Sequence, residues 1–174
     1  MPADHEEFLL VDGYNIINAW PELQKAKDVS LEAAREKLLD IMADYSGYTG
    51  IRVMVVFDAH QVEKSRGMEY DKNGVRVVFT KEGETADHYI EKMADLIARQ
   101  EKVRVATSDW IEQQIIMGRG ATRISARELL QEVENIVGKR RAGEKSRASE
   151  KQTLGDRVDP DIWKIIERNI NQDA

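Results

Sequence analysis

Short apolar runs alternate with longer amphipathic stretches along the chain. Four runs have the length and β-branched content of buried strands, and they span residues 8–11, 51–57, 75–79 and 103–106. Stretches with apolar residues at helical spacing lie between most of them, which is the pattern of a mainly parallel sheet with helices on both faces. A brief strand over residues 122–124 is a weaker prediction.

Helix start signals precede several of the amphipathic stretches. Ser30 precedes a helix predicted over residues 31–45, and Thr85 precedes one that runs to about residue 99. A shorter helix is predicted over residues 110–117. Ser125 and Glu128 have the spacing of a capping box, which indicates a further helix leading toward residue 138.

Two segments lack this periodicity. Residues 59–74 are a long polar stretch after a strand end, and we expect a loop beside the active face. Residues 142–158 are rich in Lys, Arg, Ser and Gly and predict a flexible linker or basic arm. Asp159 and Pro160 then predict the start of a terminal helix, which we expect to dock on the body through apolar residues such as Trp163.

Composition limits the chemistry that is available. The 174 residues are enough for one ordinary domain, and the 41% hydrophobic and 33% charged fractions are those of a folded protein. Cysteine is absent, which excludes disulfides, Cys-ligated zinc and thiol nucleophiles, so a metal must use oxygen or imidazole ligands. The chain has neither a signal-like start nor an apolar run near the roughly 18 residues of a membrane span, and we expect a cytoplasmic protein without membrane association.

Charge is segregated along the chain. The 26 basic and 32 acidic residues give a net charge of −6, which argues against coating nucleic acid by bulk electrostatics. Residues 139–151 hold six basic and two acidic residues, so they carry +4 and the remainder carries −10. We therefore distinguish a domain over residues 1–138 from a basic arm and C-terminal helix over residues 139–174.

Acidic residues stand where the predicted strands end. Asp12, Asp58 and Asp109 follow the first, second and fourth runs, and Asp87 falls in the first turn of a predicted helix. Ligands of open α/β sheets bind outside the carboxyl ends of the strands, so these acids are expected to converge. Taken singly, each is also an ordinary turn or cap residue.

Convergent carboxylates repel one another unless a cation compensates. Mg²⁺ or Mn²⁺ is the expected cofactor, because these hard cations prefer oxygen ligands. Such a centre activates water and neutralises charge in a displacement at phosphorus. Asn15, three residues after Asp12, can orient a water or a phosphate oxygen.

Other catalytic motifs are absent from the sequence. There is no Gly-x-Gly-x-x-Gly, no Walker lysine loop and no Gly-x-Ser-x-Gly, so no nucleotide cofactor is expected. His60 and His88 have no metal-ligand spacing and are weak candidates. Tyr14 can stack on a base, although aromatic residues in such turns more often pack against the sheet.

At these residues the sequence resembles the NYN-domain family, a branch of the PIN-like metal-dependent ribonucleases, and most closely its bacterial YacP-like members. The resemblance covers roughly residues 7–138. The matching segments are Leu-Leu-Val-Asp12-Gly-Tyr-Asn15, Val-Val-Phe-Asp58-Ala-His, Phe-Thr-Lys81-Glu-Gly-Glu84-Thr-Ala-Asp87, Val-Ala-Thr-Ser-Asp109 and Ser125-Ala-Arg127-Glu-Leu-Leu.

The resemblance implies a fold and an activity. The implied fold is a PIN-like three-layer α/β/α arrangement with a mainly parallel sheet of strand order 3-2-1-4-5. The implied activity is an endoribonuclease that uses Mg²⁺ or Mn²⁺ and, for YacP-like members, cuts mRNA on the translating ribosome. The resemblance makes Asp12, Asp58, Asp87 and Asp109 the metal-site acids, with Asn15 a catalytic polar partner and Glu84 either an additional ligand or a residue just outside the direct ligands.

Basic residues are candidates for contact with RNA phosphates. The competing interpretation for the arm is a solvated, charged helix end. The candidates are Lys81, Arg119, Arg123, Arg127, Lys139, Arg140 and Arg141.

Two other function classes stay open at this point. The first is a receiver-like signalling domain that binds Mg²⁺, with Asp58 as phosphoacceptor and Thr107 as its hydroxyl partner. Against it, the first strand ends with one acid where such domains have two, and no lysine closes a fifth strand. The second is a module that binds RNA or the ribosome without cutting.

Overall fold

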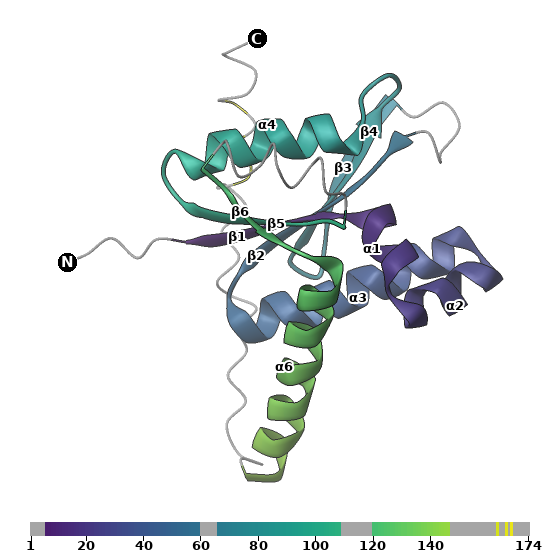
Figure 1. Cartoon of the computed structure of the whole chain (residues 1–174), viewed down its shortest axis with the longest axis vertical. Coiled ribbons are helices and arrows are strands. Elements are labelled where there is room, and N and C mark those ends of the chain that lie inside the picture. Colours follow the sequence, from purple (N-terminus) through teal and green to yellow (C-terminus); the bar gives the residue numbers. More distant parts are fainter. Residues whose placement is uncertain are drawn as a thin grey trace.

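The central strand of the molecule is β1 (Glu7–Asp12), which pairs in parallel with β2 (Arg52–Phe57) on one side and β5 (Lys102–Ala106) on the other. The computed structural model describes residues 6–59, 66–108 and 120–146, together with Trp163, Ile166 and Arg168. Its six-stranded sheet has the order β3-β4-β2-β1-β5-β6 (Figure 1). The outer strands are β3 (Arg66–Lys72), β4 (Val75–Lys81) and β6 (Thr122–Ile124).

The predicted strand order is confirmed. Counted over the five runs predicted from the sequence, the order β4-β2-β1-β5-β6 is 3-2-1-4-5, and every pair within it is parallel. The predicted loop over residues 59–74 is wrong for its second half, because β3 pairs antiparallel with β4 there. The polar composition of β3 reflects its position at the edge of the sheet. Its turn is an Asn-Gly pair, and Asn73 and Gly74 both have the positive φ that a two-residue hairpin requires.

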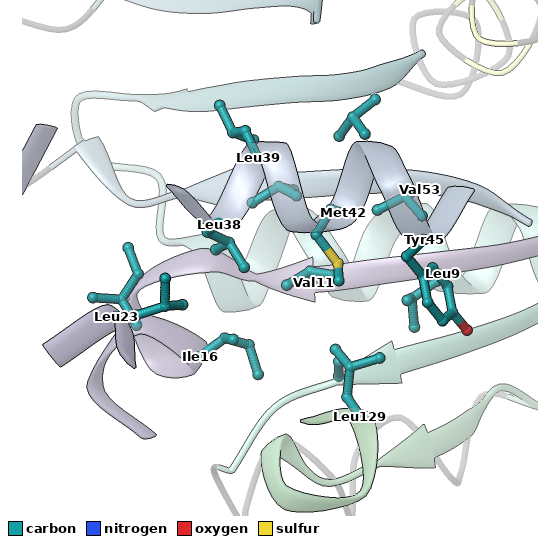
Figure 2. Packing of buried hydrophobic residues seen from close by; sticks show 14 of the residues in the cluster. Leu9, Val11, Ile16, Leu23, Leu38, Leu39, Met42, Tyr45, Val53 and Leu129 are labelled. Carbon is teal, nitrogen blue, oxygen red and sulfur yellow. The ribbon is translucent and has the colours of Figure 1, made fainter. Parts of the chain in front are cut away.

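Helices cover both faces of the sheet. On one face lie α1 (Gly13–Ala19), α2 (Pro21–Val29), α3 (Leu31–Thr49) and α6 (Ala126–Ser146), and on the other lies α4 (Ala86–Ala98) (Figure 1). Alternate residues of β1 supply two separate cores: Leu9 and Val11 pack toward α3, and Phe8 and Leu10 pack toward α4. Figure 2 shows the first core, in which Met42 lies between Val11 and Val53. The two-sided burial explains why β1 is a continuous apolar run.

The predicted helix starts are confirmed by hydrogen bonds. The hydroxyls of Ser30, Thr85 and Ser125 accept from the backbone N–H three residues later, at 2.9, 3.2 and 3.1 Å. The helices α1 and α2 were not predicted. The first begins at Asp12-Gly13, a pair typical of turns, and the second buries only Leu23. The helix predicted over residues 110–117 lies outside the described residues.

The C-terminal part departs from the sequence prediction. Helix α6 continues through Ser146, so the linker predicted over residues 142–158 is wrong for residues 142–146, where the sequence includes the good helix formers Ala, Glu and Lys beside Gly and Ser. The division proposed between residues 138 and 139 therefore falls inside α6. The predicted docking of the terminal segment is confirmed at Trp163, which is 3% exposed and packs edge to face on Phe8 at 5.3 Å between ring centroids.

A polar network joins three elements beneath the sheet. Arg104 of β5 donates to Glu132 of α6 at 2.8 Å and to the hydroxyl of Tyr45 of α3 at 2.8 Å, and that hydroxyl donates to Glu132 at 3.0 Å. Burial raises the pKa of Tyr45 to about 12, and the hydrogen bond to Glu132 acts in the same direction. Burial alone would raise the pKa of Glu132, but the hydrogen bonds from Arg104 and Tyr45 outweigh it and lower that pKa.

None of the described helices has the length and apolar character of a membrane span.

The raised pKa of Tyr45 predicts a loss of stability at alkaline pH. The folded state holds the phenolic proton more tightly than the unfolded chain, whose tyrosines titrate near 10.0. The stabilisation is therefore complete below pH 10 and disappears as the pH rises through about 12. We expect the free energy of unfolding in urea to fall more steeply between these pH values in the wild type than in Tyr45→Phe. Parallel profiles for the two proteins would contradict this assignment.

Candidate active site at the carboxyl edge of the sheet

Asp12 and Asp58 lie at the ends of neighbouring strands and on the same face. Asp12 is paired with Val56, so Asp58 stands two residues further along the adjacent strand. Side-chain alternation directs both acids to the α4 side, where Leu10 and Val56 are buried. Strand spacing places the two Cα atoms about 8 Å apart. Asp12 is 9% exposed and Asp58 is half-buried, so this edge holds two acids with limited access to solvent.

The start of α4 is attached to this edge by Asp58. The backbone N–H of Ala86 donates to Oδ2 of Asp58 at 3.3 Å. The positive end of the helix dipole favours a carboxylate there. Asp87, the next residue, is exposed in the first turn of α4. Glu84 forms an ion pair with Lys92 at 3.4 Å, so its carboxylate already has a basic partner.

Asn15 holds the end of β5. Its Oδ1 accepts from the backbone N–H of Ser108 at 2.6 Å and also from the Ser108 hydroxyl. The chain is thereby fixed beside α1 one residue before Asp109, which itself lies outside the described residues. Asn15 is thus a positioning residue in this structure, in addition to any contact it makes with water or phosphate.

Gly13 allows α1 to begin immediately after Asp12. A Cβ at this position would lie 2.3 Å from a ring carbon of Phe57, so only glycine fits without displacing that ring. The ring of Tyr14 also packs on Phe57, at 5.1 Å between ring centroids. Each residue of the Asp-Gly-Tyr-Asn segment therefore has its own task. Asp12 supplies a carboxylate, Gly13 lets the backbone approach Phe57, Tyr14 packs its ring on Phe57, and Asn15 holds Ser108.

The hydroxyl of Tyr14 faces Arg35 of α3. Nη1 of Arg35 donates to it at 3.2 Å. Burial raises the pKa of Tyr14, Arg35 opposes the shift, and the negative charge of Asp58 adds to it. The phenol of Tyr14 is therefore near enough to Asp58 to sense its charge.

Two further side chains at this edge had no role in the sequence predictions. Thr80 is 1% exposed, and its hydroxyl accepts from the backbone N–H of Ala59 at 2.9 Å, which joins the ends of β4 and β2. Arg35 belongs to an amphipathic helix and has the sequence context of a surface residue. A polar residue at the end of an apolar run is the only sequence signal for Thr80, and Arg35 has none.

The donor set is compatible with a hard divalent cation but is incomplete in the described part of the chain. Asp12 and Asp58 offer carboxylate oxygens on one face, and Mg²⁺ is typically held by one or two carboxylates with waters and substrate phosphates. Within the residues described, no group of three or more His, Asp or Glu side chains is close enough to hold a metal ion. The four-acid centre predicted from the sequence is thus represented here by Asp12 and Asp58, with Asp87 nearby on α4.

The basic candidates are divided between two regions. Lys81 and Arg127 are exposed at the carboxyl edge, at the end of β4 and in the first turn of α6, and Arg123 is exposed on β6. Lys139 lies about 20 Å further along α6, given the rise of an α-helix. Arg140 pairs with Asp44 at 3.6 Å. The structure therefore does not bring Lys139 and Arg140 together with the acids.

Three further candidates fall outside what the structure describes. They are Arg119, His60 and the side chain of Arg141.

Removing the glycine at position 13 is expected to destabilise the fold. Gly13→Ala drives a methyl group into the ring of Phe57, and overpacking of this kind costs about 1–3 kcal/mol. The matched control is Gly47→Ala in α3, where nothing lies within 4 Å of the added Cβ. The control should gain about 0.5–1 kcal/mol from helix propensity. The measurement is the free energy of unfolding in urea, and an unchanged value for Gly13→Ala would show that Phe57 has room to move.

The family, sequence and structure matches of this chain all point to YacP-like proteins. The sequence pattern of a family described as the YacP-like NYN domain matches residues 9–171. The YacP protein of Bacillus subtilis (strain 168) is 53% identical over 133 residues, which are 75% of this chain and 76% of that protein.

Two solved structures are also similar. A crystal structure of Rae1 (YacP) from Bacillus subtilis has a TM-score of 0.70 and 45% identity over 95% of both chains. A crystal structure of a tryptophan-to-leucine mutant of the same Bacillus subtilis protein has a TM-score of 0.71 and 48% identity over 84% of this chain and 86% of that one.

Proposed function

Because the chain belongs to the YacP-like NYN domain family, a nuclease family of PIN-like fold, we propose that it is a divalent-metal-dependent endoribonuclease. Its proposed substrate is mRNA on the translating ribosome. The observation that carries the proposal is the pair Asp12 and Asp58, which end adjacent parallel strands on one face beside the start of α4. Two carboxylates on one face repel each other, and a divalent cation held by them would relieve that repulsion.

The roles follow from the positions of the side chains. Asp12 and Asp58 would hold Mg²⁺ or Mn²⁺, which when bound activates water and neutralises charge at the phosphorus. Asp87, exposed in the first turn of α4, and Asp109, after β5, would complete the set of acids. Asn15 keeps Ser108, just after the end of β5, against α1. In this proposal Glu84 does not touch the metal directly, since Lys92 already binds its carboxylate.

Contacts to RNA would be few and local. Lys81 and Arg127 are exposed at the carboxyl edge and suit phosphate contacts on either side of the acids. The net charge of −6 predicts weak affinity for free RNA, so a larger partner that presents the RNA fits the charge distribution. Lys139, Arg140 and Arg141 are then a second contact, to the ribosome, at a distance from the acids.

The receiver-like alternative loses its support in the fold. Doubly wound receiver-like sheets have the order 2-1-3-4-5, whereas this sheet has the order β3-β4-β2-β1-β5-β6 with an antiparallel edge. A module that binds RNA or ribosomes without cutting remains the competing function, and the first experiment below separates it from a nuclease.

Cleavage is expected to depend on the acids. In a translating extract, Asp12→Asn and Asp87→Asn should lower the rate of mRNA cleavage at least about 100-fold, since even groups that only orient metal ligands are worth 10–100-fold. The control is Asp40→Asn, at an exposed position of α3, which should cut like the wild type. Primer extension on the reporter mRNA measures the cuts. Wild-type cleavage by both site variants would contradict a nuclease built on these acids, and absence of cleavage by the wild type would favour the binding module.

Metal binding is expected to appear without any cleavage assay. Mn²⁺ at 100 times its Kd should stabilise the folded wild type by about 2.7 kcal/mol, which raises Tm. Asp12→Asn and Asp58→Asn should remain folded and show little of this rise, because each loses a carboxylate ligand. Differential scanning calorimetry with and without Mn²⁺ makes the comparison. Equal rises in wild type and both variants would place the cation elsewhere.

A further inference from the structure

Arg35 of α3 differs from the other half-buried arginines. In the described part of the chain four arginines are half-buried, and three of them form ion pairs with carboxylates: Arg52 with Glu6, Arg76 with Glu69 and Arg104 with Glu132. Within the same residues, Arg35 has no carboxylate at ion-pair distance. Its hydrogen bond is to the neutral hydroxyl of Tyr14, which uses one of the five N–H donors of a guanidinium. Most of its donor capacity therefore remains for an anion.

The position of this guanidinium is set by a row of aromatic rings. Tyr14, Phe57, Phe79 and Tyr70 follow one another at centroid distances of 5.1, 5.2 and 6.4 Å. The guanidinium carbon of Arg35 lies 5.7 Å from the centre of the Phe79 ring. A cation over a ring face is attracted by the ring, and a planar guanidinium held in this way loses little freedom on binding a ligand. The rings and the Tyr14 hydroxyl thus hold Arg35 in one orientation.

The row of rings runs along the same edge of the sheet as the acids. Phe57 directly precedes Asp58, Phe79 directly precedes Thr80, and Tyr14 is two residues after Asp12. Phe57 and Phe79 belong to the core of the α3 face and the two tyrosines pack against it, whereas alternation along β1 and β2 directs the acids to the α4 face. A strand of RNA that crosses the carboxyl edge past the acids would next reach Arg35.

We propose that Arg35, oriented by Tyr14 and Phe79, binds a backbone phosphate of the RNA next to the one that is cut. This proposal rests on the proposed function and adds a substrate-binding residue that the acids do not provide. The chemistry fits, because guanidinium and phosphate form paired, charge-assisted hydrogen bonds. The acids at this edge repel RNA, which is a polyanion. Arg35 reduces that repulsion because it places positive charge on the side of the edge away from α4.

The test measures RNA binding separately from cleavage. Asp12→Asn serves as the parent, so that the RNA stays intact, and the probe is a short fluorescein-labelled single-stranded RNA at low salt. Adding Arg35→Gln should weaken binding roughly 10-fold. It should also reduce the slope of log Kd against log salt concentration by about 0.7, the value for one phosphate contact on a single strand. Arg35→Lys should retain the slope and lose part of the affinity, and Tyr14→Phe should weaken binding without a change of slope.

The control removes the same charge elsewhere. Arg99 is exposed at the end of α4, on the opposite edge of the sheet, and Arg99→Gln should leave both affinity and slope unchanged. Melting curves verify folding, and Arg35→Met, which removes the charge but keeps a long unbranched side chain beside Phe79, replaces Arg35→Gln if the latter unfolds.

The outcomes separate this proposal from the function on which it rests. If the wild type does not cut mRNA in the translating extract, the proposed function fails whatever Arg35 does. If the wild type cuts and Arg35→Gln retains the salt slope, the phosphate contact is overturned and the nuclease stands, even where cleavage is slowed. Absence of measurable RNA binding by the Asp12→Asn parent at low salt also overturns the contact, because Arg35 is proposed to bind RNA itself.

Discussion

The pairing of β1 with a parallel strand on each side organises the rest of the structure. Because both faces of β1 are buried, helices must cover both faces of the sheet, and because β2 and β5 flank it, the ends of three strands meet at one edge. Asp12 lies at the centre of that edge as a direct result. The Gly13–Phe57 contact, the Asn15–Ser108 hydrogen bonds and the Thr80–Ala59 hydrogen bond then fix the neighbouring segments around it.

The extent to which the sequence predicts this arrangement depends on what each residue contacts. Apolar runs such as Val53–Phe57 mark buried parallel strands, and an acid directly after such a run marks the carboxyl edge. The runs alone do not give the order of the strands, which was implied by the resemblance to the NYN-domain family. β3 was missed because an edge strand has polar residues on both faces. Arg35 was missed for a different reason: a helical arginine has the same sequence context whether it faces solvent or an aromatic ring, and only tertiary packing decides which.

The arginines of this molecule differ in whether a carboxylate neutralises their charge. Arg52, Arg76 and Arg104 are neutralised by carboxylates and tie strands to one another or to α6, so they contribute to the fold and little to the outer electric field. A side chain such as Arg35, held by neutral and aromatic groups, keeps its full field. Net charge alone therefore describes the affinity for a polyanion poorly, because paired and unpaired cations count equally in it.

The contact between Trp163 and Phe8 has a consequence for how the protein is made. It joins two residues that are far apart in the sequence, and β1 also needs β5 before its second edge is paired. Contacts between such distant parts of a chain form late and slow folding. During synthesis, Phe8 therefore lacks this ring contact until residue 163 has been added, and the core on the α4 side of β1 stays incomplete for most of the time that the chain is being made.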